Sequence, residues 1–141
     1  MAGYSYPEGG PPADLLVEGR GRTMGEAFAN VALAMYNAIT PLEGIHERET
    51  FTVEVDGSDY ESLLFNFLAE LLYRVDVDGL IAKRIKIEII PTDFKLSARC
   101  VGERFSATTH EAGASVKAVT YHMMRIEEEN GAWTVRTVFD T

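Results

Sequence analysis

The sequence predicts an α+β fold, a single mainly antiparallel sheet with two helices packed on one face. Two observations lead to this prediction. A strand, a helix-start signal and an apolar helix follow one another twice, over residues 13–40 and 50–76. Beyond residue 83 the chain shows only strand patterns and turn signals.

Length and composition indicate one domain. The chain has 141 residues, enough for a single core, and 46% hydrophobic with 25% charged residues is ordinary for a soluble protein. No run approaches the ~18 apolar residues of a membrane span, and the first residues do not resemble a secretion signal. We therefore expect a cytoplasmic protein with a flexible lead-in at residues 1–12 and one domain at residues 13–141.

The first strand–helix unit follows a lead-in rich in proline and glycine, where Tyr4 and Tyr6 could add a short edge strand. Residues 13–21 are predicted to form a strand. Thr23 and Glu26 then form a capping box, which predicts a helix start. The apolar stripe of this helix consists of Phe28, Val31, Ala32, Met35 and Ile39.

The second unit begins with residues 50–56, which alternate between apolar and polar as a half-buried strand does. Ser58 and Glu61 form a second capping box. The following helix is expected to face a sheet and to end at residues 76–79. Its wide apolar stripe consists of Tyr60, Leu63, Leu64, Phe67, Leu68, Leu71, Leu72 and Val75.

The second half is predicted to be all strand. Strands are expected at 84–90 and 94–101, joined by a turn at 91–93, and a polar loop at 106–115 carries His110. Residues 116–127 are apolar on both faces and are expected to form the central strand. Asn130-Gly131 predicts a tight hairpin. The inner face of the last strand is expected to carry Trp133, Val135 and Phe139.

Lys117 lies within the apolar stretch 116–127. An ammonium beside a covered strand must reach water or meet a partner. The simpler interpretation is a lysine at a strand end whose side chain extends into water, since buried lysines are rare.

The charge and the cysteine content argue against several classes of function. A net charge of -9 with 13 scattered basic residues argues against a broad nucleic-acid surface. If the protein works on RNA, we expect a partner to hold the RNA. The single cysteine, Cys100, excludes an internal disulfide and a Cys-rich zinc site, and is expected to pack in the core. A Cys100–His pair for nucleophilic catalysis stays open, although nothing local supports it.

Two other patterns carry little chemistry. Residues 19–24, GRGRTM, follow a strand and open a helix, but Met24 stands where a dinucleotide fingerprint has its third glycine. The three histidines, His46, His110 and His122, show no ligand spacing, so a structural role is expected for each.

Carboxylates at the ends of two strands suggest a metal site. Asp14 opens the first strand, Asp140 closes the last, and the Thr141 carboxylate is expected beside it. If these two strands meet, three oxygen donors converge, which suits calcium or magnesium. The alternative is that both aspartates simply face water, as most do.

Several motifs together resemble the archease family over nearly the whole chain after residue 12. In order they are GEAF at 25–28, LLFNFLAELL at 63–72, Gly102-Glu103, His110, VKAVTYH at 116–122 and Asp140-Thr141. The VKAVTYH stretch is similar to the family's V-K-A-[IV]-T-[YF]. One departure is PPAD at 11–14, where the family usually has H-T-A-D.

This resemblance implies an accessory protein rather than an enzyme. Archeases assist the RtcB-type RNA ligase of tRNA splicing, promoting guanylylation of the ligase with GTP and multiple turnover. By resemblance, Asp14, Asp140 and Thr141 would bind a divalent metal ion, calcium before magnesium. Lys117, with His110 and Glu103, would act on the ligase partner, and tRNA would be reached only through the ligase, with no membrane involved.

Two alternatives stay open. One is a free-standing small enzyme built around Lys117, His110 and Glu103. The other is a generic protein-binding or chaperone-like module that uses the same sheet.

Overall fold

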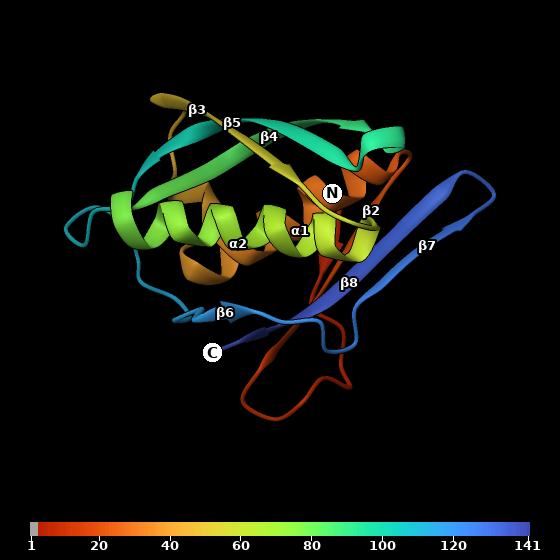
Figure 1. Ribbon diagram of the computed structural model, residues 1–141. Coiled ribbons are helices and arrows are strands. Elements are labelled where there is room, and N and C mark those ends of the chain that lie inside the picture. The colour runs from red at the N-terminus through yellow and green to blue at the C-terminus, as the bar shows by residue number, and fades with distance from the viewer. Residues whose placement is uncertain (1–2) are drawn as a thin grey trace.

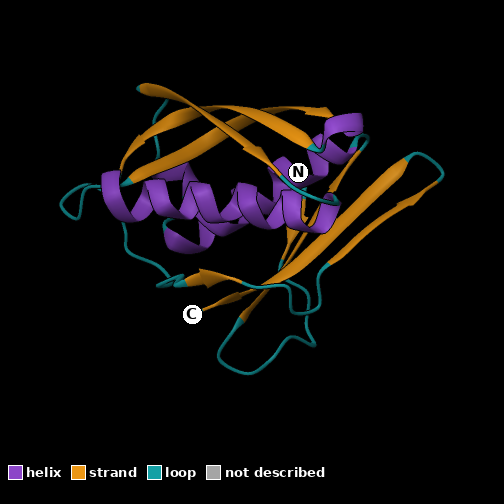
Figure 2. Ribbon diagram, in the orientation of Figure 1, coloured by secondary structure: helices purple, strands orange, loops and turns teal. Residues whose placement is uncertain are grey.

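The structure, a computed structural model, describes residues 3–141. In that part of the chain, two antiparallel sheets lie on either side of a layer of two helices (Figure 1). The α+β class, the antiparallel pairing and the two helices agree with the sequence prediction. The sheet detail differs, because the strands divide between two sheets instead of one (Figure 2).

The larger sheet has the strand order β1 (Tyr4–Ser5), β2 (Leu15–Gly21), β8 (Ala132–Asp140) and β6 (Ala118–Val119), and β7 (Arg125–Glu129) also pairs with β8. The smaller sheet has the order β3 (Glu49–Asp56), β5 (Lys95–Arg104) and β4 (Leu80–Ile90). The helices are α1 (Met24–Ile39) and α2 (Tyr60–Asp78), and short 3-10 turns cover Leu42–Gly44 and Pro91–Asp93.

Small residues let α1 contact both sheets. Ala27 and Ala34 are fully buried, beyond the single apolar stripe that the sequence suggested. A Cβ on Gly19 of β2 would lie only 2.6 Å from the Ala27 carbonyl oxygen, and one on Gly25 would lie 3.3 Å from Ile87 of β4. Backbone therefore approaches backbone on two sides of one helix, which one sheet alone would not require.

The same contact explains the glycines of the GRGRTM stretch. A Cβ on Gly21 would lie 2.7 Å from the Ala27 nitrogen, so Gly19 and Gly21 are needed for α1 to pack on β2. Every strand pair between residues 3 and 141 is antiparallel, whereas a dinucleotide fold needs a parallel return strand. Packing accounts for these glycines without a nucleotide.

One of the two predicted helix caps is confirmed and the other is wrong. The Thr23 hydroxyl accepts a hydrogen bond from the Glu26 N–H at 3.1 Å, as predicted. At the second helix the cap is Asp59, not Ser58. Its carboxylate accepts from the Ser62 N–H at 2.8 Å, and the Ser62 hydroxyl accepts in return from the Asp59 N–H at 3.2 Å. A carboxylate is the stronger acceptor at a helix N-terminus, and the hydrogen bond from the Ser62 N–H lowers the pKa of Asp59.

The prediction of a central strand at residues 116–127 is wrong. This stretch forms β6 and the start of β7, with a turn between them, and β8 occupies the centre of the sheet. In the turn, Met123 has a left-handed φ of 56°, and the Met124 N–H donates to the Tyr121 carbonyl at 3.1 Å. A turn without glycine or proline leaves the alternating pattern of the sequence unbroken, so the pattern did not reveal it.

Other sequence predictions are confirmed. Asn130 and Gly131 have φ values of 54° and 78° in the hairpin between β7 and β8, and Val135 and Phe139 are fully buried. Cys100 is buried in the core, and burial raises the pKa of its thiol to about 12. The strand β1 lies within the lead-in, whose separation from the domain stays a prediction. Across residues 3–141, no helix has the length and apolar character needed to span a membrane.

Candidate functional site

Asp14 and Thr141 meet where β2 begins and β8 ends. These strands pair antiparallel, so the first residues of β2 lie beside the last residues of β8, and Asp140 is the final residue of β8. The Thr141 N–H donates to Asp14 Oδ1 at 3.4 Å, and the Thr141 hydroxyl donates to the Ala13 carbonyl. The structure therefore brings the predicted metal-binding residues to one end of the paired strands β2 and β8.

Lys117 lies at the same end of these strands. Its main-chain N–H donates to the Asp140 carbonyl at 2.8 Å, and Ala118, the next residue, lies opposite Asp140 in the sheet. The Lys117 side chain is exposed. We call Asp14, Lys117, Asp140 and Thr141 the strand-end cluster.

The donor chemistry of the strand-end cluster fits a hard cation. Asp14 and Asp140 are exposed carboxylates, and the long 3.4 Å hydrogen bond leaves most of the Asp14 oxygen lone pairs free. The side chains alone are too few, because no group of three or more His, Cys, Asp or Glu side chains within residues 3–141 is placed to hold a metal. A bound cation would need main-chain or hydroxyl oxygens and water as well.

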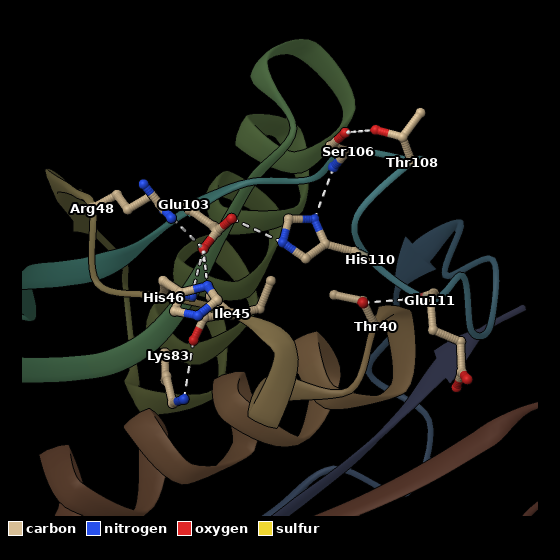
Figure 3. Close-up of polar contacts among 10 residues, drawn as sticks. All are labelled: Thr40, Ile45, His46, Arg48, Lys83, Glu103, Ser106, Thr108, His110 and Glu111. Atoms are coloured by element: carbon tan, nitrogen blue, oxygen red, sulfur yellow. Dashed lines mark hydrogen bonds and ion pairs between the residues drawn. The ribbon is translucent and has the colours of Figure 1, made fainter.

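Glu103 lies at the centre of a second group of polar residues (Figure 3). The carboxylate is 2.8 Å from His110 Nε2 and 3.1 Å from His46 Nδ1, and it accepts the His46 main-chain N–H. Arg48 Nε is 3.8 Å away. We call His46, Arg48, Glu103 and His110 the Glu103 cluster. Glu103 is 8% exposed and the His110 side chain 1%, so both are interior groups.

A β-bulge allows Glu103 to turn inward. The pairing of β4 with β5 shifts between Ala82 and Arg84, and Lys83 in the bulge donates to the Ile45 carbonyl at 3.0 Å. Beside the bulge, a Cβ on Gly102 would lie 1.8 Å from the carbonyl oxygen of Ile81. Only glycine permits this approach, which places the next residue, Glu103, at the buried end of β5.

The tautomer of His110 follows from its neighbours. Its Nδ1 accepts a hydrogen bond from the Ser106 main-chain N–H at 2.9 Å, so the ring proton lies on Nε2. Nε2 faces Glu103 at 2.8 Å, but the contact is not aligned as a full hydrogen bond. Phe105 packs beside the ring, with centroids 5.7 Å apart. His110 is thus a buried donor directed at a carboxylate.

Opposing effects set the ionisation of Glu103. Burial alone would raise its pKa, but the His46 main-chain N–H and the contacts with His110 and the His46 ring lower it, and the net pKa lies below the usual value. Glu103 is therefore a charged carboxylate at neutral pH, held by groups from two other chain segments, residues 46–48 and His110.

The Glu103 cluster fixes the segment that leads to Lys117. His110 anchors its beginning, and the Thr40 hydroxyl donates to the Glu111 carbonyl at 2.7 Å. Further on, the Gly113 N–H donates to a carbonyl at the end of α1 at 2.7 Å. The segment is irregular, yet it is attached along its length to β5 and α1. Glu103 and His110 are thus suited to positioning Lys117.

The structure separates the six residues that the sequence singled out. Asp14, Asp140 and Thr141 lie with Lys117, whereas Glu103 and His110 form their own buried pair. A small enzyme built around Lys117, His110 and Glu103 would need all three in one place. The main chain of Lys117 is hydrogen-bonded to Asp140 instead.

His46 and Arg48 were not among the predicted site residues. Both reach Glu103 from a position more than 50 residues earlier in the chain, His46 at a separation of 57. No local motif indicates such a contact, and only the short spacing of the two residues could have drawn attention to them. His122 is exposed and lies outside both clusters.

Comparison with known proteins places the chain among relatives of one kind. Residues 4–141 match the model of the archease protein family. Proteins named archease from Pyrococcus abyssi and Pyrococcus furiosus are 40% and 41% identical over 131 residues, which cover 91% of this chain and 92% of each relative. An archease-like protein of Drosophila melanogaster is 36% identical over 119 residues, 83% of this chain and 76% of that protein.

Solved structures show the same similarity to archeases. The solution structure of protein 1598 from Methanobacterium thermoautotrophicum has a TM-score of 0.85 and 33% identity, with all of both chains covered. The crystal structure of an archease from Thermotoga maritima, described as a possible chaperone, has a TM-score of 0.64 over 92% of this chain and 91% of that one. At 22% identity, this second similarity concerns the fold alone.

Proposed function

We propose, because this chain belongs to the archease family, that it is a non-catalytic activator of an RtcB-type RNA ligase in tRNA splicing. In this role it promotes guanylylation of the ligase with GTP and supports multiple turnover. The ligase holds the tRNA, and the chain acts on the ligase.

One observation carries the proposal, the hydrogen bond from the Lys117 N–H to the Asp140 carbonyl. It supports a common exposed region at the ends of β2 and β8, to which Lys117, Asp14 and Asp140 each contribute an exposed side chain. A flexible lysine with a compact charge is suited to contact a phosphate or a carboxylate on another molecule. The net charge of -9 favours a partner with a basic surface, as an RNA-binding ligase has.

The proposed cofactor is a divalent metal ion in the strand-end cluster, calcium before magnesium. Asp14, Asp140 and an oxygen of Thr141 would hold it, and water would complete the coordination. When bound, the ion would supply positive charge at an acidic surface. Since it binds the folded chain, it should also raise thermal stability by mass action.

The metal proposal is tested by calorimetric titration of the chain with calcium and then with magnesium. Asp14→Asn and Asp140→Asn should each abolish binding, while Asp93→Asn, an exposed aspartate in the turn after β4, should not. Equal affinity in all three variants would rule out the site.

Glu103 and His110 are proposed as positioning residues. They hold the segment 105–117, and so act on the partner through Lys117 rather than by contact. A variant at Glu103 should lower the affinity for the ligase or the stimulation of it, together with the stability of the chain.

A chaperone-like module is the second candidate, favoured by the description of the Thermotoga maritima archease as a possible chaperone. The two candidates are separated by assaying GTP-dependent guanylylation with the ligase alone, the chain alone and the mixture. Stimulation in the mixture supports the activator. Suppression of aggregation for several unrelated proteins, without stimulation of the ligase, would support the chaperone. Turnover by the chain alone would contradict both.

A further inference from the structure

Tyr121 and Phe65 form an aromatic stack between α2 and the turn that joins β6 to β7. Their ring centroids are 4.4 Å apart and the ring planes differ by 7°. Phe65 therefore covers one face of the Tyr121 ring, yet Tyr121 remains 52% exposed. No second aromatic ring is stacked on Tyr121 within residues 3–141, so the ring face opposite Phe65 is the part available to a further flat ligand.

The turn holds Tyr121 in place. The Tyr121 carbonyl accepts the Met124 N–H at 3.1 Å, and the His122 carbonyl accepts the Val138 N–H of β8 at 3.2 Å. The His122 N–H donates to the Thr120 hydroxyl at 3.1 Å. The ring is thus fixed by its backbone and by Phe65 before any ligand arrives, which lowers the entropy cost of binding.

The chain segment that carries this ring has a charge opposite to that of the whole chain. Residues 112–126 include two cations, Lys117 and Arg125, with the imidazole of His122 between them, and no aspartate or glutamate, although the net charge of the chain is -9. All three side chains are exposed. Arg125 has one ion pair, to Glu127 at 3.4 Å, and such an exposed pair contributes little and exchanges easily. An anionic group is therefore favoured next to the open ring.

We propose that Tyr121 is a stacking platform for one unpaired base of a single-stranded RNA, with the adjoining phosphates beside His122 and Arg125. An aromatic face flanked by cations is the usual means of holding a single strand without reading its sequence. A free nucleotide needs a more enclosed pocket than a half-exposed ring on a turn provides. A protein partner would favour an interface core depleted of charge, which this turn is not.

This inference goes beyond the proposed function and does not depend on it. A platform for one base differs from the broad basic surface that the composition argues against, and it adds one direct contact to an RNA held mainly by another protein. On its own the contact is weak. It becomes effective when a partner raises the local concentration of the RNA.

The test is binding of a short fluorescent single-stranded RNA to the purified chain, measured by fluorescence anisotropy at low salt. Tyr121→Ala should weaken binding by about tenfold, the range expected for loss of one base stack. Tyr121→Phe should bind like the wild type because it keeps the ring. Tyr73→Ala is the matched control, since Tyr73 on α2 is 58% exposed. Circular dichroism checks that each variant is folded.

Two further measurements identify the ligand. Binding should show a shallow salt dependence, a slope of log K against log salt of about -1.4 for two phosphate contacts. Free GTP should compete poorly with the RNA. Strong competition by GTP, equal binding of double-stranded RNA, or equal binding by Tyr121→Ala would each overturn the proposal. The absence of RNA binding would overturn it as well, and a Tyr121→Ala chain that then bound the ligase less tightly would identify the ring as a protein contact.

Discussion

Replacing Glu103 with glutamine tests the buried polar cluster. The change keeps the shape of the side chain but removes its charge. The carboxylate has one oxygen facing His110 Nε2 and another accepting the His46 N–H, and the amide group has a single oxygen for both. One buried donor then loses its acceptor, which costs about 1–3 kcal/mol. For a domain of this size a loss of ~2 kcal/mol corresponds to a fall in Tm of roughly 4–8 °C.

The pH dependence adds a sharper criterion. The pKa of Glu103 is lowered in the folded chain, so its stabilising effect is present above the unfolded pKa and is lost as the pH falls through the folded pKa. The difference in unfolding free energy between wild type and Glu103→Gln should therefore be largest at neutral pH and shrink in acid.

The assay is urea unfolding followed by circular dichroism, at pH 7 and at a series of acidic pH values. Glu54→Gln is the matched control, since Glu54 is an exposed glutamate on β3. It should change stability by less than about 0.5 kcal/mol. A Glu103→Gln chain as stable as the wild type, or a difference that stays constant with pH, would refute the argument that a charged Glu103 holds these segments together.

Three other predictions concern the fold. Asp59→Ala should lower the Tm measured by circular dichroism more than Ser58→Ala does, because Asp59 is the cap of α2; the reverse order would restore the prediction made from sequence. Gly102→Ala should prevent folding or reduce stability severely, since its Cβ would lie 1.8 Å from the backbone oxygen of Ile81. Gly44→Ala is the control and should be tolerated, because a Cβ there would have no atom within 4 Å. The Cys100 thiol should resist a thiol reagent at neutral pH until the chain is unfolded, because it is buried and its pKa is about 12; rapid labelling of the folded chain would contradict this.

The sequence predicted the elements well where a local signal exists. The T-x-x-E pattern at Thr23 indicated the first cap, and Asn130-Gly131 indicated the hairpin. The prediction failed where a turn carries no sequence signal or where the deciding contact is not local. Nothing near residues 116–127 indicates that Met123 turns left-handed, and the second sheet depends on the close approach of α1 to β2 and β4.

The candidate sites likewise differ in how far the sequence could predict them. Asp14 and Asp140 are 126 positions apart, and their juxtaposition follows from the antiparallel pairing of the first long strand with the last. The sequence is compatible with that pairing but contains no local signal that specifies it. The Glu103 cluster was harder to predict from the sequence. His46 and Glu103 come together through a bulge and a glycine contact that no spacing rule describes.

The central claim is that the strand-end cluster activates an RNA ligase, and the most direct measurement is the initial rate of GTP-dependent guanylylation of the ligase. The rate is compared for wild type, Lys117→Ala, Lys117→Arg and Lys95→Ala, the last being an exposed lysine on β5 that serves as control. The account predicts full stimulation by wild type and Lys95→Ala, and none by Lys117→Ala although that variant is folded. Lys117→Arg should also fail if the site needs a compact charge. Normal stimulation by Lys117→Ala would contradict the account.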